Sequence, residues 1–213
     1  MNNLPLKGLK VIELPSGQAG AYCGRLFHQY GAEVTRINYP AEESDNLDQD
    51  AEYLHIGKSI LEFNFRSNHD TENLNFLLSK SHILIHSSKQ NPTTKINLGK
   101  INNPKLISIS ITDMGTTGPL KNLETSDLIL QAASGLMSVS KSQNGIPLKI
   151  PGNQSYFHAG SYAYSAGVAA LFAMDQTGNG CSIEISVLES ILPIIAPQLL
   201  HSTYSNLPDN KLV

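Results

Sequence analysis

Histidines are the first candidates for metal binding or acid–base chemistry in this sequence. His82 and His86 lie four residues apart, a spacing that places two ligands on one face of a helix. In a strand they would also share a face, but no carboxylate or cysteine joins them locally, so we expect solvated strand ends and no metal. His158, near Tyr156 and Asn153 at the start of a predicted helix, is a candidate base or ligand, although a lone histidine is more often structural.

Nucleophilic side chains form no familiar motif. The hydrolase elbow G-x-S-x-G does not occur. Cys23 lies on the apolar stripe of a predicted helix, where burial disfavours a reactive thiolate. Together with Cys181 it makes neither a disulfide framework nor a metal cage. Considered alone, these side chains do not identify a reaction.

A glycine-rich stretch over residues 15–20 is the best candidate for ligand binding. It separates an apolar run, typical of a buried strand, from a helix whose apolar residues recur at i, i+3, i+4 and i+7. The spacing does not match G-x-G-x-x-G, and the position of a ribose-binding acid is occupied by Asn38, so no nicotinamide cofactor is expected. The glycines fit a tight turn with close helix packing, and the N–H groups there would suit an anionic ligand.

Strand and helix patterns alternate along most of the chain. The residues at 41–53 are predicted to form an exposed acidic loop, those at 96–101 a weak helix, and those at 188–200 an apolar segment that Pro193 and Pro197 kink or break. The alternation predicts a right-handed parallel α/β sheet. Strands are expected over residues 11–14, 34–37, 59–65, 83–85, 106–111 and 182–187, and helices after 67–70, from Ser126 and over Tyr156–Met174.

Composition excludes several classes of function. The 213 residues carry a net charge of −3, which argues against a nucleic-acid-binding surface. The N-terminus lacks the apolar core of a signal peptide, and the apolar run from Ala166 to Met174 is too short to span a bilayer. These features predict a cytoplasmic protein without membrane or nucleic-acid partners.

Five separated motifs resemble the class III (family III) CoA-transferases, which include formyl-CoA and carnitine CoA-transferases and the α-methylacyl-CoA racemases. The motifs occur in the family's order and cover nearly the whole chain. They are Gln18-Ala19-Gly20 with Gly31-Ala32-Glu33-Val34, Lys58-Ser59-Ile60 with Asn64-Phe65-Arg66-Ser67, Asn103–Ile107 with Gly115–Pro119, Asp127 with Gln131–Met137, and Ala169-Ala170-Leu171 with Thr177–Gly180 and Ile183–Val187.

The resemblance implies an open, parallel, Rossmann-like α/β domain with helices on both faces, and a homodimer whose chains interlock. It implies coenzyme A or an acyl-CoA as ligand, with no permanently bound cofactor. The positions that match the family's CoA-lining residues are Ser16, Gly17, Gln18, Ala19, Tyr39, Ser87 and Ser88.

This sequence departs from the family at the reacting groups. The family's transferases form an acyl anhydride on an aspartate, and that aspartate falls at Tyr156, with no Asp or Glu between Gly145 and Met174. The proton-transfer histidine of the racemases falls at Ser126. The family's basic residue after the second strand falls at Tyr39, and its asparagine near the fourth strand falls at Ser87. No catalytic residue is therefore assigned, and His158 is the nearby candidate.

The resemblance also predicts how the chain is organised. Residues 1–187 are expected to form the α/β domain, and residues 188–213 an apolar, proline-containing segment that packs on a partner chain; the family's smaller second domain is not expected. Two functions stay open. One is a CoA-transferase-like enzyme whose partner supplies the missing carboxylate. The other is a non-catalytic CoA-binding or dimerisation module, or the partner subunit of a split CoA-transferase.

Overall fold

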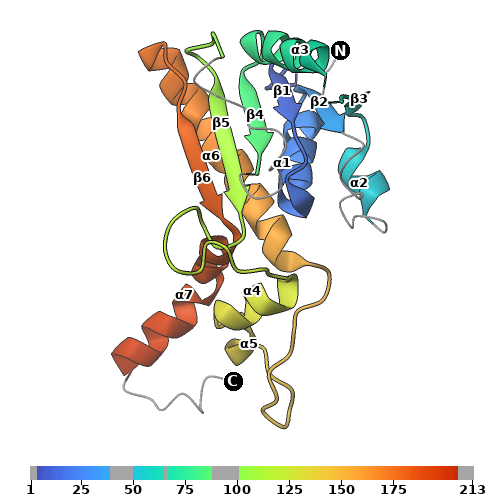
Figure 1. Cartoon of the computed structure of the whole chain (residues 1–213). Coiled ribbons are helices and arrows are strands. Elements are labelled where there is room, and N and C mark those ends of the chain that lie inside the picture. Colours follow the sequence, from blue (N-terminus) through green and yellow to red (C-terminus); the bar gives the residue numbers. More distant parts are fainter. Residues whose placement is uncertain (1–3, 39–49, 65–66, 88–100, 206–213) are drawn as a thin grey trace.

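A six-stranded parallel sheet organises the computed structural model, which describes residues 4–38, 50–64, 67–87 and 101–205 (Figure 1). The strand order is β3-β2-β1-β4-β5-β6. The strands are β1 (Lys10–Glu13), β2 (Glu33–Asn38), β3 (Ser59–Glu62), β4 (Ile83–His86), β5 (Ile107–Thr112) and β6 (Ser182–Ser186). The helices are α1 (Gly17–Gln29), α2 (Ala51–His55), α3 (Asn68–Ser79), α4 (Asp127–Ala133), α5 (Leu136–Val139), α6 (Gln154–Thr177) and α7 (Val187–Ser205).

Two apolar layers cover the sheet, so the predicted α/β class is confirmed. On one face the strand residues Val11, Ile85 and Ile109 pack with Phe27 of α1 and Ala163 of α6. The opposite face buries another set of strand residues against α3, and this set comprises Ile12, Leu14, Ile37 and Leu84 with Leu74 and Leu78. Central strands such as Ile83-Leu84-Ile85 are buried on both faces, which explains their continuous apolar run.

The chain reverses direction across the sheet between β1 and β4. From β1 it proceeds outward through β2 and β3, and then returns to place β4 on the other side of β1. Ligands of open α/β sheets bind outside the carboxyl ends of the strands at such a switch point. The ends of β1, β4 and β5 therefore position the candidate site.

Close packing of α1 on α6 requires the small residues that the sequence concentrates in α6. A Cβ added to Gly160 would lie 2.6 Å from the carbonyl oxygen of Ala19 in α1. The two helices therefore approach within backbone contact just where α1 begins. The rigid crossing fixes the start of α1 relative to the start of α6.

Two predicted elements differ from the structure. The part of the predicted loop at 41–53 that is described ends in helix α2, because Leu54 is buried against Ala21 of α1. The segment after β6 forms the single helix α7, which continues through Pro193 and Pro197; of the expected kink or break, the break is therefore wrong. The weak helix expected over 96–101 lies outside the described residues except for Ile101.

One side of α7 belongs to the main core, and another side is solvent-exposed. Ile191 is fully buried and Ile195 is 6% exposed, whereas Leu192, Leu199 and Leu200 are 43–57% exposed. Among the helices that the structure describes, none combines the length and the hydropathy needed to cross a membrane.

Candidate functional site

The N-terminus of α1 lies at the switch point, and it begins earlier than the sequence suggests. The predicted turn over residues 15–20 is shorter, because Gly17, with φ +67°, already starts the helix and Gln18–Gly20 form its first turn. Leu14 N–H donates to Ile85 O (2.9 Å), which ties the end of β1 to β4. The first N–H groups of a helix have no partner within the helix. Because α1 begins after the carboxyl end of β1, these groups lie at that edge of the sheet.

Ser16 and Gln18 make contacts within the chain. Ser16 Oγ donates to Leu14 O (3.0 Å) and does not cap α1, so the helix start keeps its N–H groups for another acceptor. Gln18 Nε2 donates to Asp50 Oδ2 (2.7 Å) in front of α2. Ala19 is buried and Gly17 half-buried. Of the predicted CoA-lining set, these residues therefore offer a ligand mainly backbone N–H groups.

The other predicted CoA-lining residues follow strands β2 and β4. Ser87 directly follows β4 and is half-buried. Strand β4 pairs with β1, the strand that leads into α1. Tyr39 and Ser88 lie outside the described residues.

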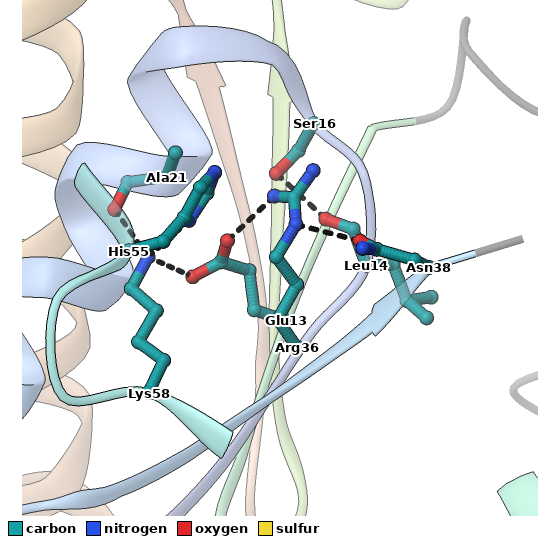
Figure 2. Close-up of polar contacts among 8 residues, drawn as sticks. All are labelled: Glu13, Leu14, Ser16, Ala21, Arg36, Asn38, His55 and Lys58. Carbon is teal, nitrogen blue, oxygen red and sulfur yellow. Dashed lines mark hydrogen bonds and ion pairs between the residues drawn. The ribbon is translucent and has the colours of Figure 1, made fainter. Parts of the chain in front are cut away.

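A buried ion cluster, which our sequence analysis did not predict, supports this edge of the sheet (Figure 2). Glu13 Oε1 accepts from Arg36 Nη1 (2.8 Å), and Oε2 accepts from Lys58 Nζ (2.6 Å). Lys58 Nζ also donates to Ala21 O (2.8 Å), and Arg36 Nε to Asn38 Oδ1 (2.8 Å). The cluster joins β1, β2, α1 and the residue before β3. The only signal in the sequence was a charged residue within each of two apolar strands.

Burial controls the protonation of groups around this cluster. Burial lowers the pKa of Lys58, although the Glu13 carboxylate opposes the shift. Burial, together with the charges of Arg36 and Lys58, lowers the pKa of His55 to about 4, so its ring is neutral near pH 7. Burial also raises the pKa of the Cys23 thiol, which is fully buried and therefore stays protonated, as its stripe position predicted.

Tyr156 lies in the first turn of α6, beside residues that follow β5. Its hydroxyl lies beside Thr125, and Thr125 Oγ1 donates to Asp113 Oδ2. Burial raises the pKa of Tyr156 to about 12, and the nearby Asp113 carboxylate raises it further. Because Thr125 gives its one proton to Asp113, its hydroxyl can only accept toward Tyr156. The result is a short relay that ends on a carboxylate.

Asp127 fixes the start of α6 around this relay. Its Oδ1 accepts from Ser155 N (3.0 Å), and its Oδ2 accepts from Gln131 Nε2 (2.8 Å) and Lys149 Nζ (2.8 Å). It thus caps a helix whose own N-cap residue, Asn153, makes no side-chain cap. Ser126, at the position of the racemases' histidine, accepts from Ile129 N and caps α4. Both residues have structural roles here.

The predicted histidine candidates do not meet. His158 follows Tyr156 by two residues, or about 200° around the helix, so it lies on the other side of α6. His82 Nδ1 accepts from Lys10 N (3.0 Å), and His86 Nε2 contacts Ser108 Oγ (2.9 Å). Burial lowers the pKa of His86. Within the described ranges, no three His, Cys, Asp or Glu side chains gather as metal ligands would.

The topology defines a parallel α/β domain whose candidate ligand site lies at the carboxyl edge of its sheet. The model of CoA-transferase family III matches residues 6–211, so the chain belongs to this family, as the five motifs indicated.

Three comparisons describe its relatives. The chain is 28% identical to the succinate–glutarate CoA-transferase of Agrobacterium fabrum, over 98% of this chain and 57% of that protein. It is 25% identical to the succinyl-CoA:(R)-benzylsuccinate CoA-transferase subunit BbsE of Thauera aromatica, over 85% of this chain and 48% of that protein. A CAIB/BAIF family protein from Brucella suis has the same fold, with a TM-score of 0.86 and 26% identity, over 97% of this chain and 60% of that one. The chain thus spans about half the length of these relatives.

Proposed function

We propose that this chain binds acyl-CoA and serves in the transfer of coenzyme A between carboxylic acids, with the nucleotide end of CoA at the start of α1. The observation that carries the proposal is the position of the uncapped α1 N-terminus at the β1/β4 switch point. Helix N-termini attract phosphate through oriented N–H groups and the helix dipole. Relatives named for CoA-transfer between carboxylic acids support the choice of ligand.

The same edge of the sheet also carries groups for the acyl end. Asp113 directly follows β5, two strands from β1 in the sheet order. Neighbouring strands lie about 4.8 Å apart, so the ends of β1 and β5 are separated by roughly 10 Å. An extended ligand such as CoA can therefore contact the α1 start and the Tyr156 relay at once.

A second candidate function is a non-catalytic CoA-binding subunit that acts with another chain. Tyr156 favours it, because a phenol cannot form the acyl anhydride that the family's aspartate forms. The exposed leucines of α7, Leu192, Leu199 and Leu200, favour a partner that covers them. BbsE, a relative, is itself named as a subunit. Analytical ultracentrifugation tests this part of the proposal: self-association, or association with a partner chain, is expected, and a lone monomer at micromolar concentration would contradict it.

Calorimetric titration of the full chain with CoA tests the binding proposal. We expect saturable binding that weakens with added salt, because the phosphates meet a positive helix end. Ser16→Asp should abolish binding by placing a carboxylate at the N-cap, whereas the matched neutral variant Ser16→Asn should bind.

Both variants can cap α1, so a Ser16→Asp protein that is at least as stable as Ser16→Asn would show that only charge distinguishes them. Absence of CoA binding by the unmodified chain, or equal binding by both variants, would contradict the proposal.

A further inference from the structure

Asp113 is held firmly by its backbone at the end of β5. Its carbonyl oxygen accepts from Leu188 N (2.9 Å) and from Ser186 Oγ (3.4 Å), which links it to β6 and to the start of α7. The side chain is half-buried, and one oxygen, Oδ2, accepts from Thr125. The residue is thus fixed in direction while part of its carboxylate stays accessible.

Other carboxylates near this edge are committed to structural contacts. Both oxygens of Asp127 are hydrogen-bonded, and the residue is only 5% exposed. Both oxygens of Glu184 accept from the backbone and hydroxyl of Thr116. By contrast, Oδ1 of Asp113 has no hydrogen-bond or salt-bridge partner among the described residues. Asp113 is therefore the carboxylate beside the first turn of α6 that keeps one oxygen available to react.

We propose that Asp113 is the acyl-accepting carboxylate of this chain and that Thr125 and Tyr156 are its positioning residues. The inference rests on the proposed CoA-transfer function. Thr125 donates to Oδ2, with the protonated Tyr156 phenol beside it, which leaves Oδ1 as the attacking atom. The position that the resemblance assigns to the nucleophile thus holds a residue that orients the nucleophile.

The reaction needs no oxidant or further cofactor. Oδ1 of Asp113 attacks the thioester carbonyl carbon, and the C–S bond breaks. CoA leaves as a thiolate, and a mixed anhydride between Asp113 and the acyl group remains. The thiolate then attacks the Asp113 carbonyl carbon and expels the first acid as its carboxylate, which leaves an aspartyl-CoA thioester. Attack by the second acid's carboxylate forms a new anhydride and releases CoA thiolate. That thiolate takes the new acyl group and restores the Asp113 carboxylate.

Chemical trapping on the full chain tests this assignment. The protein is incubated with succinyl-CoA, quenched with hydroxylamine, digested and mapped by mass spectrometry. We expect an aspartyl hydroxamate at Asp113. Asp113→Asn should abolish the mark, whereas the matched change Asp175→Asn, at an exposed position of α6, should keep it. Tyr156→Phe should slow the formation of the mark by about 10-fold without moving it, because one orienting hydrogen bond is lost.

A CoA titration of each variant separates the two levels of the proposal. CoA binding by Asp113→Asn shows that this variant is folded and isolates the loss of the carboxylate. CoA binding by the unmodified chain without a hydroxamate at Asp113, or with the mark at another residue, would overturn the assignment of Asp113 and leave the proposed function standing. Failure of the unmodified chain to bind CoA would overturn both.

Discussion

Two polar clusters at the same edge of the sheet differ in how their charges are satisfied. Around Glu13, both carboxylate oxygens are bonded to cations and every member of the ion pairs is buried. Around Asp113, one carboxylate oxygen is bonded to a hydroxyl and the other has no partner among the residues that the structure describes. A fully paired buried charge is costly to disrupt, whereas a half-satisfied, half-buried carboxylate keeps an oxygen available for chemistry. The contrast assigns support to the first cluster and reaction to the second.

The largest expected effect is on the Glu13 cluster. Glu13→Ala leaves Lys58 and Arg36 buried without their shared counter-ion, which should lower the free energy of unfolding by about 3–5 kcal/mol. Denaturant titration measures the change. The matched change Glu62→Ala, on the exposed strand β3, should stay within about 0.5 kcal/mol. If both variants were equally stable, the cluster would not be the scaffold that the contrast requires.

A smaller effect is expected where the helices of the two clusters meet. A Cβ at Gly160 would press on the Ala19 carbonyl, so Gly160→Ala should cost about 1–3 kcal/mol despite the better helix propensity of alanine. Gly167→Ala is the comparison variant, because the atoms nearest to its new methyl belong to the side chains of Ile109 and Phe27 and not to the backbone. A larger loss for Gly167→Ala in thermal unfolding would refute the close backbone approach of α1 and α6.

The smallest expected effect is a pH dependence beside the Glu13 cluster. His55 has a pKa of about 4 in the folded chain, against an ordinary 6.5. Between these two pH values, the imidazole is protonated in the unfolded chain and neutral in the folded chain. Stability is complete above pH 6.5 and falls as the pH drops to about 4. Because the ring is half exposed, the loss should be on the order of 1 kcal/mol.

The change His55→Gln should reduce this acid loss, while His69→Gln, on the exposed surface of α3, should leave it unchanged. Because burial also lowers the pKa of His86, the difference between variant and unmodified chain isolates His55. Identical profiles in denaturant titrations at pH 4–7 would contradict a neutral His55.

The sequence revealed the sheet better than the site, for physical reasons. Apolar periodicity marks strands such as Ile83–His86 and the long helix α6, because burial by the sheet determines those residue types. Helix α2 was missed because Leu54 is its one buried residue, so the helix has no apolar periodicity that the sequence could show. The turn before α1 was overestimated because Gly17 and Gly20 are typical of turns, yet Gly20 is needed where a Cβ would overlap Ser16.

The site depends on contacts that are distant in sequence. Glu13 meets Lys58 across 45 residues, and no local pattern records that pairing. Position 156 emerged from the family resemblance, but the relay to Asp113 through Thr125 did not, because Asp113 had the features of an ordinary turn residue. Only the arrangement of β5, α4 and α6 brings the three residues together.

A crystal structure of the full chain soaked with CoA most directly tests whether the Glu13 cluster is structural and Asp113 is the reacting group. We predict phosphate groups at the backbone N–H groups of residues 17–20 and the CoA sulfur beside Asp113, with the Glu13 cluster unchanged and out of contact with the ligand. CoA bound with its sulfur away from Asp113, or with the Glu13 carboxylate in contact with the acyl end, would contradict it.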